Sequence, residues 1–365
     1  MDSFNFEKRT VGKTAVIMGD GLIDELVGYF CHTFQEGALC LVYDRNVTEI
    51  AENIAEQLKR AGYRIFMQAV SSKRHGDVAS QPVAPEYVRH VFAVGAGTAC
   101  EYAKRMARTL DAEWTLFLTA PSTDTVMHGF APKTVFIDEN VMINCPFECK
   151  AAGYGILFAQ PLRVFENFFA RKVLAKEQPT PEGVPQGAPN ESELAYALLE
   201  ISLTEEADSA QLMAQVMYKA AVARGRRPRL IGEYKYLASA CISSFYTAFL
   251  GALSIDAMPP ACREIAADKL KSIGYLSNRS KSVDFFDSKG YFKISYILGE
   301  YRTDLLDKLS SIDFHTTQRF WRRLYPDAGY WLKGEITCRD IITCLSLTGY
   351  LSDSLLGFAY ASGVI

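Results

Sequence analysis

A turn of small residues in the first half of the chain has the composition of a phosphate-binding loop. The stretch HVFAVGAGTACEYAKRMA (90–107) reads as a strand, a turn and a helix, and the turn consists of Gly95, Ala96 and Gly97. Small residues let the backbone approach a ligand closely, and the free N–H groups and dipole of the next helical turn favour a pyrophosphate. Thr98 could add a hydroxyl. Because any strand-to-helix turn favours small residues, this turn alone leaves a purely structural role open.

Polar groups also follow two other predicted strands. Asp44 ends the apolar run LVYDRN, and TAPSTDT (119–125) follows a later run. A carboxylate at the end of a strand can accept hydrogen bonds from a ribose diol and repels a 2′-phosphate, which favours NAD over NADP. The alternative is that Asp44 caps the helix expected after Asn46. The hydroxyls of 119–125 come at a carboxyl end of the sheet, where ligands bind in open α/β folds.

The elements that must position these groups alternate along the first 145 or so residues. Apolar runs occur at 15–21, 38–46, 63–70, 90–97, 114–122 and 133–140. They are continuous and rich in β-branched and aromatic residues, which is typical of strands buried on both faces. The stretches between them are amphipathic, as in 47–62, where Ile50, Ile54 and Leu58 recur every fourth residue. This alternation predicts a Rossmann-like, doubly wound and mostly parallel sheet.

The strand pattern stops near residue 150, and helical patterns follow. We therefore expect an α/β protein with a dinucleotide-binding domain at 1–148 and an all-helical domain at 149–365. The segment 176–193 holds four prolines together with several glycines and glutamates. It is expected to be a mobile surface loop between helices. A lid over the cleft between the domains is the alternative.

Composition excludes several classes of protein. Lys and Arg number 39 against 42 Asp and Glu, so the formal charge of −3 argues against a nucleic-acid surface and a polybasic membrane patch. No run of about 18 apolar residues is present, so no transmembrane helix is expected. The start is polar and lacks the apolar core of a signal peptide. The nine scattered cysteines suit a reduced compartment, and the protein is expected to be cytoplasmic.

Five motifs follow one another over residues 10–175: VYDRN, VGAGTACEYAK, TAPSTDT, VFIDENVM and AAGYGILFA. Their order and spacing resemble those of the dehydroquinate synthase-like and iron-containing alcohol dehydrogenase superfamily. Within it, the chain is most similar to the glycerol dehydrogenase and glycerol-1-phosphate dehydrogenase branches.

This resemblance implies that NAD lies in the cleft between the two domains, with NADP less favoured. Asp44 would meet the adenosine ribose. The turn residues would meet the pyrophosphate: Gly95, Ala96, Gly97 and Thr98. Thr119 and Ser122 would lie near the cofactor, and Asp124 would bind a polyol hydroxyl close to the nicotinamide.

The sequence departs from the family at the metal ligands. Members of the family hold a divalent ion with one acidic residue and two histidines. Here the acidic position falls on Ile156, and the histidine positions fall on Lys235 and on Ala261 or Cys262. Isoleucine cannot ligate a metal, and the lysine ammonium has no acceptor lone pair. None of the chain's histidines stands at a ligand position: His32, His75, His90, His128 and His315. We therefore expect no metal.

Two residues are candidates for the chemistry that the ion would otherwise supply. Lys235 stands at a ligand position, and its ammonium could stabilise a developing alkoxide or act as an acid or base. The alternative is an ordinary lysine on a helix surface. His128, in a shortened loop, could carry a proton or contact the substrate, and the alternative is a solvated loop histidine.

Three functions remain open from the sequence. The first is an NAD(P)-linked oxidoreductase that works without a metal on a small polyol, a sugar or their phosphates. The second is a non-catalytic descendant that binds a nucleotide as a partner or regulatory subunit. The third is a cyclase similar to dehydroquinate synthase, although its metal and phosphate-binding cations are not apparent. Convergence of Asp124, Lys235 and His128 would favour an enzyme, whereas Ile156 and Phe158 filling that space would favour the second function. The superfamily suggests a homo-oligomer.

Overall fold

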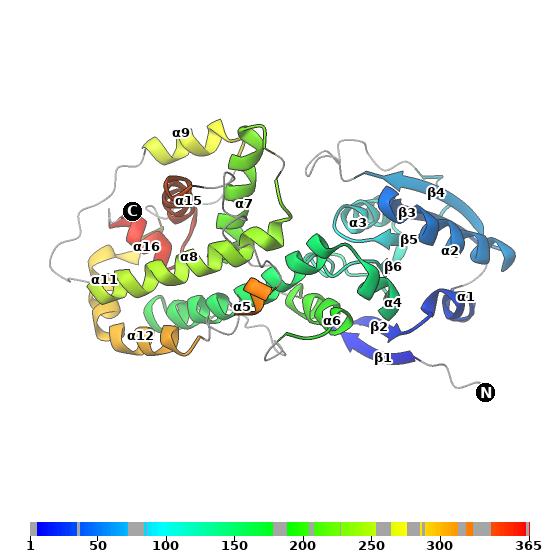
Figure 1. Cartoon of the computed structure of the whole chain (residues 1–365), viewed down its shortest axis with the longest axis horizontal. Coiled ribbons are helices and arrows are strands. Elements are labelled where there is room, and N and C mark those ends of the chain that lie inside the picture. The colour runs from blue at the N-terminus through cyan, green and yellow to red at the C-terminus, as the bar shows by residue number, and fades with distance from the viewer. Residues whose placement is uncertain are drawn as a thin grey trace. The chain divides into compact units, whose positions relative to one another are not determined.

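The computed structural model consists of two compact units. It describes residues 6–34, 37–71, 84–85, 87–177, 188–203, 208–226, 228–252, 264–275, 285–286, 289–312, 319–323, 337–362 and 365. The first unit comprises Met1–Gly153 and Pro181–Glu205, and the second comprises Tyr154–Thr180 and Glu206–Ile365 (Figure 1). This division differs from the predicted one at 148/149, because a segment from the middle of the chain returns to the first unit.

The first unit is built on a seven-stranded sheet in the order β1-β2-β7-β6-β5-β3-β4. Its strands are β1 (Phe6–Val11), β2 (Thr14–Gly19), β3 (Ala38–Asp44), β4 (Arg64–Val70), β5 (His90–Gly95), β6 (Glu113–Leu118) and β7 (Thr134–Asp138). Within the described sheet only the β1–β2 pair is antiparallel. The predicted mostly parallel sheet is thus confirmed, with β1 as an addition that the sequence did not suggest.

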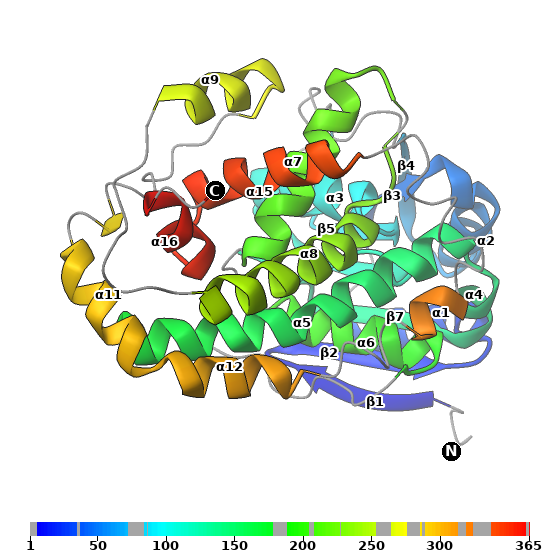
Figure 2. The same ribbon diagram turned by 60° about the vertical axis from the view of Figure 1, so that its left-hand side comes forward.

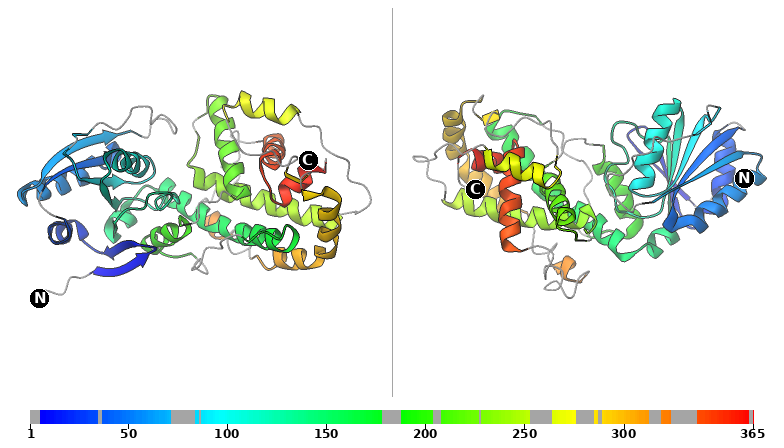
Figure 3. Two further views of the ribbon diagram at one scale, coloured as in Figure 1. Left: turned by 180° about the vertical axis from the view of Figure 1, so that it is seen from behind. Right: turned by 90° about the horizontal axis from the view of Figure 1, so that it is seen from above.

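Helices cover both faces of this sheet (Figure 3). One face packs against α1 (Leu22–Thr33) and α2 (Thr48–Arg60). The other packs against α3 (Thr98–Leu110) and α6 (Glu191–Ile201). The short α4 (Glu139–Asn144) contacts β7 and α6. Side chains of successive residues in each central strand point to opposite faces of the sheet. Because helices cover both faces, the strands are apolar throughout.

The helix α6 explains why the observed units differ from the predicted domains. Its residues Ala195 and Leu199 are buried in the core of the first unit. It begins inside the segment 176–193 that was predicted to be a mobile loop, because Asn190 caps it by accepting a hydrogen bond from the backbone N–H of Glu193 at 2.9 Å. The greater part of that predicted loop lies outside the described residues.

The second unit is helical throughout its described residues, as predicted. Its helices are α5 (Phe147–Val173, shared with the first unit up to Gly153), α7 (Ser209–Ala223), α8 (Ile231–Ala252), α9 (Glu264–Ser272), α11 (Tyr291–Glu300), α12 (Arg302–Ser310), α15 (Cys338–Leu351) and α16 (Leu355–Ala361). No single described helix is long and apolar enough to cross a membrane. The bent pair Arg339–Leu351 and Leu355–Ala361 has the required length and composition together, and α16 is buried along its whole length.

Two glycines of α5 allow unusually close backbone contacts. A Cβ at Gly153 would lie 2.0 Å from the carbonyl oxygen of Pro121, within the first unit. A Cβ at Gly155 would lie 2.1 Å from the carbonyl oxygen of Gly232, so that α5 and α8 lie side by side in the second unit (Figure 2). No side chain fits at either distance, and the obstacles are backbone atoms that cannot turn aside.

Gly155→Ala should therefore destabilise the protein by about 2–4 kcal/mol, since the new methyl group forces two helix backbones apart. The matched control is Gly251→Ala, also in the second unit, where a Cβ meets no atom within 4 Å. That change should leave the unfolding free energy unchanged or raise it by up to about 1 kcal/mol. Urea unfolding of both variants measures the difference, and equal stabilities would contradict the contact.

A buried carboxyl group joins several helices of the second unit. Glu166 of α5 is 6% exposed, and it accepts hydrogen bonds from the Ser209 N–H at 3.0 Å and from the Tyr246 hydroxyl at 2.6 Å. The Tyr246 oxygen in turn contacts the Ser354 hydroxyl at 3.1 Å, ahead of α16. Burial, reinforced by the negative charge of Asp208, raises the pKa of Glu166 to about 7, despite the hydrogen bonds from Ser209 and Tyr246.

The raised pKa of Glu166 predicts that the folded protein becomes less stable as the pH rises. Because the pKa of Glu166 is higher in the folded than in the unfolded chain, the folded state binds the proton more tightly. Its contribution is therefore greatest at low pH and is lost as the pH rises from about 4.5 to about 7. The Glu166→Gln variant lacks this loss of stability. Its unfolding free energy relative to that of the unaltered chain should therefore be higher at pH 8 than at pH 5, by on the order of 3 kcal/mol. Chemical unfolding at both pH values tests this, with exposed Glu300→Gln as the control that should show no such difference.

Candidate functional site

The carboxyl edge of the sheet contains a point where the direction of the chain reverses. From β3 the chain continues to β4 on one side of the sheet, whereas from β5 it continues to β6 and β7 on the other. The neighbouring strands β3 and β5 therefore lead away in opposite directions. In open α/β sheets, such a switch point leaves a crevice beyond the carboxyl ends of the two strands, and ligands bind there.

Gly95 brings three of the predicted site residues together at this point. It ends β5 with φ +148°, and a Cβ built on it would lie 2.8 Å from Cβ of Ala99 and 3.4 Å from Cβ of Asp44. Its carbonyl oxygen accepts a hydrogen bond from the backbone N–H of Thr119 at 3.2 Å. The ends of β3, β5 and β6 thus meet through Asp44, Gly95 and Thr119, and only glycine allows this approach.

The rest of the predicted turn borders open space at the start of α3. Gly97 has φ +42°, and a Cβ at this residue would meet no atom within 4 Å. Ala96, Gly97 and Thr98 are all partly exposed, and α3 begins at Thr98. This combination of a bare backbone, open space and a helix N-terminus fits the pyrophosphate of a dinucleotide. The donor chemistry and shape of the turn therefore suit the expected cofactor.

Asp44 caps the helix that follows it, as the alternative interpretation predicted. Its Oδ1 accepts hydrogen bonds from the backbone N–H and from the side-chain amide of Asn46, both at 2.8 Å. The capped turn is the short 3₁₀ helix η1 (Arg45–Val47), ahead of α2. Both bonds use the same carboxylate oxygen, so within the described part of the chain Oδ2 has no partner of its own. The cap and the predicted contact to a ribose are compatible.

The loop after β6 carries the next group of predicted residues. Thr119 is buried, while Ser122 and Asp124 are partly exposed. The carbonyl oxygen of Pro121, which lies between Thr119 and Ser122 in the chain, packs against Gly153 of α5. The motif resemblance placed Ser122 near the cofactor and Asp124 near the substrate, and these roles stay predictions.

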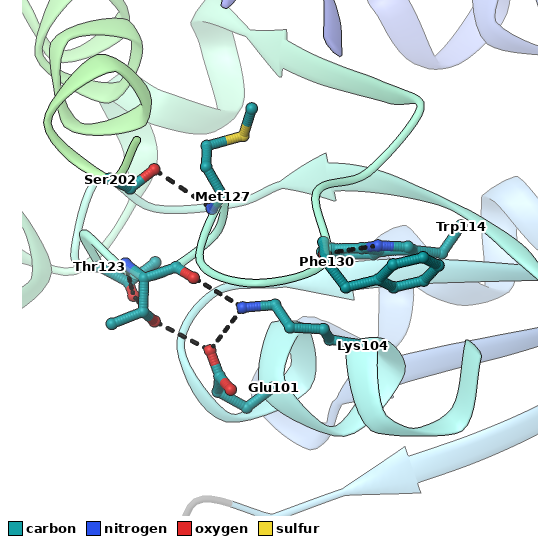
Figure 4. A network of polar contacts seen from close by, with 8 residues as sticks. Glu101, Lys104, Trp114, Thr123, Met127, Phe130 and Ser202 are labelled. Atoms are coloured by element: carbon teal, nitrogen blue, oxygen red, sulfur yellow. Dashed lines mark hydrogen bonds and ion pairs between the residues drawn. The ribbon is translucent and has the colours of Figure 1, made fainter. Parts of the chain in front are cut away.

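Sequence reasoning missed the contacts that hold this loop. Lys104 of α3 donates to the Thr125 carbonyl oxygen at 2.7 Å and to Glu101 Oε1 at 3.1 Å (Figure 4). The loop is also tied at Met127, whose N–H donates to the Ser202 hydroxyl at 3.2 Å (Figure 4). The available signal was the pair of opposite charges three residues apart on the helix after the glycine turn.

His128 lies in the same loop as Asp124. Its backbone N–H donates to the Thr125 carbonyl oxygen at 3.1 Å, and its side chain is partly buried. The loop is short, as predicted, because β7 begins at Thr134. A proton-carrying role for His128 stays a prediction.

Lys235 is buried in the second unit. It lies in the second turn of α8 and is 3% exposed, so the interpretation as an ordinary surface lysine is wrong. Nearby, Glu233 is also buried and pairs with Arg229 at 3.1 Å. Because Lys235 belongs to one unit, and Asp124 and His128 to the other, their convergence stays a prediction.

The described residues at the predicted ligand positions do not suit the divalent ion that the resemblance implies. Ile156, at the acidic position, is 2% exposed and offers no lone pair. Among the described residues, no group of three or more His, Cys, Asp or Glu side chains could hold a metal ion. Ala261 and Cys262, at the remaining ligand position, lie outside the described residues.

No curated protein sequence matches the chain. Among solved structures, a glycerol dehydrogenase from Schizosaccharomyces pombe is similar, with a TM-score of 0.47, 14% identity, and 89% of this chain and 95% of that chain covered. A probable glycerol dehydrogenase from Sinorhizobium meliloti 1021 gives a TM-score of 0.49 and 16% identity, covering 84% of this chain and 99% of that chain. An NADH-dependent butanol dehydrogenase from Thermotoga maritima gives a TM-score of 0.47 and 12% identity, covering 95% of this chain and 99% of that chain.

A family model matches the part of the chain that carries the switch point. Residues 17–146 match the model described as iron-containing alcohol dehydrogenase. They include β3, the glycine turn after β5, and the loop after β6. The resemblance predicted from the motifs is thus confirmed over this segment, which is similar to the iron-containing alcohol dehydrogenases.

Proposed function

We propose that the protein is an NAD-linked oxidoreductase that acts on a small polyol, a sugar or a sugar phosphate. The observation that supports this most is the contact of Asp44, Gly95 and Thr119 at the switch point, beside the open turn at Gly97. The match of residues 17–146 to a dehydrogenase family supports the same reaction class.

In the proposed complex, bound NAD(H) supplies hydride transfer, and this chain's residues orient the reactants. The turn at Gly97 and the start of α3 hold the pyrophosphate through backbone N–H groups. Asp44 accepts hydrogen bonds from the adenosine ribose diol and repels the 2′-phosphate of NADP. Asp124 orients a hydroxyl of the substrate.

Lys235 takes the electrostatic role in this proposal. In the direction of carbonyl reduction, the Lys235 ammonium would stabilise the alkoxide that develops on the substrate and would donate a proton to its oxygen. His128, in the loop after β6, is the proposed proton carrier. The buried position of Lys235 supports this role, because a desolvated cation acts more strongly on a nearby charge than a solvated one.

A second candidate is a non-catalytic subunit that binds a nucleotide. The observation that favours it is that apolar side chains of α5 are packed around Ile156, the residue at the predicted acidic metal-ligand position. Ile156 is buried, and the Phe158 ring packs against Tyr154 with centroids 6.0 Å apart and against Tyr236 at 6.4 Å. A cyclase similar to dehydroquinate synthase has less support, since that chemistry depends on a metal.

Isothermal titration calorimetry tests the cofactor and its selectivity. The unaltered chain should bind NADH more tightly than NADPH. Asp44→Asn keeps an oxygen to cap η1 but removes the charge, so it should shift the NADH-to-NADPH affinity ratio toward NADPH by about tenfold. The matched control is exposed Asp111→Asn, which should leave the ratio unchanged. Binding of neither nucleotide would overturn the proposed function.

Turnover assays over a panel of polyols and their carbonyl products separate the first two candidates. Lys235→Met should lower kcat by about 100-fold or more, as when an oxyanion donor is removed, with NADH affinity within about threefold. Exposed Lys293→Met serves as the control, and added chelator should not change the rate. Tight binding of NADH by the unaltered chain without turnover on any substrate would favour the non-catalytic subunit.

A further inference from the structure

Lys104 is a buried lysine on the helix that begins at the proposed pyrophosphate site. The residue is 3% exposed, although lysine is almost never buried unless it is paired. It lies on α3, two turns from the open glycine turn, and its ammonium is held by Glu101 at 3.1 Å and by the Thr125 carbonyl oxygen at 2.7 Å (Figure 4). The buried cation is therefore compensated by one neighbour on the same helix, Glu101, and by one residue of the loop after β6, Thr125.

The same loop residue is held a second time. The Thr125 hydroxyl donates to Glu101 Oε1 at 2.9 Å, so both of its hydrogen-bonding oxygens contact α3 side chains. That hydroxyl also contacts the Thr123 hydroxyl at 3.1 Å. Asp124 lies between these two threonines, so the residue after it is tied to α3 directly, and Thr123 is linked to α3 through the Thr125 hydroxyl.

Glu101 is in the first turn of α3, directly after the turn that would hold the pyrophosphate. A helix is rigid over one turn, because its backbone hydrogen bonds fix consecutive residues. The distance from the start of α3 to Thr125 is thus fixed by the side chains of Glu101 and Lys104. Loss of these contacts would remove the attachment of Thr125, the residue after Asp124, to α3 while leaving the glycine turn in place.

We propose that Lys104 and Glu101 form a latch that positions Asp124 relative to a dinucleotide held at the start of α3. The latch acts on the nicotinamide half of the ligand, which Ser122 and Asp124 of the same loop would border, and not on the adenosine diphosphate half. Lys104 is a positioning residue. This inference rests on the proposed function, since it concerns the same ligand.

The test compares two ligands that share the adenosine diphosphate half. Calorimetry with NADH and with ADP is carried out on the full chain and on Thr125→Val, which removes one hydroxyl without changing the charge. NADH affinity should fall about tenfold and ADP affinity by less than about twofold. Thr125→Ser retains the hydroxyl and should restore NADH binding. Melting temperatures confirm that each variant is folded.

A second pair of variants addresses the lysine itself. Lys104→Met should show the same selective loss of NADH affinity, and Lys104→Arg should restore part of it. The matched control is Arg105→Met, an equal change of charge at the exposed neighbouring position, which should leave both affinities within about twofold.

The outcomes distinguish the latch from the proposed function. If NADH and ADP lose affinity equally, or if neither changes, the positioning role is wrong while nucleotide binding stands. If the unaltered chain binds neither ligand, the proposed function fails and the latch fails with it.

Discussion

The missing side chain of Gly95 determines how the carboxyl edge of the sheet is assembled. A methyl group there would collide with Ala99, at 2.8 Å, and would press on Asp44 at 3.4 Å. Its absence lets α3 start directly above the ends of β3 and β5. The backbone hydrogen bond from Thr119 to Gly95 then fixes the loop after β6 at the same place. The positions of the Asp44 carboxylate and of the hydroxyl-bearing loop both depend on this one close approach.

The parallel sheet was predictable because its strands are buried on both faces. The runs 38–43 and 91–97 are continuously apolar. Strands that are covered by helices on both faces have no solvent-facing side, so polar residues do not alternate along them. The strand β1 was not predictable in the same way, since Glu7, Lys8 and Arg9 give it a polar sequence. It forms because it pairs with β2 at the sheet edge, and Arg9 is held by Glu193 of α6 at 2.8 Å.

The candidate site could be predicted in part, and the limit has a physical cause. Gly95, Gly97 and Asp44 act through the local backbone, so their neighbours in the sequence already indicate the turn and the cap. The contact of Lys104 with Thr125 joins residues separated by a whole strand, and no local pattern specifies it. Burial of Lys235 is likewise a tertiary property, because helix periodicity places it on a face without saying what covers that face.

The cap on η1 bears on the thermodynamics of ligand binding. The two hydrogen bonds from Asn46 hold the Asp44 carboxylate in a single rotamer before any ligand arrives. Immobilising a flexible side chain on binding costs about 0.5–1.5 kcal/mol in lost entropy. The Asp44 side chain is already immobilised in the folded chain, so ligand binding does not incur this loss. A diol that docks against Oδ2 would find its acceptor preorganised, so Asn46 would contribute to affinity without touching the ligand.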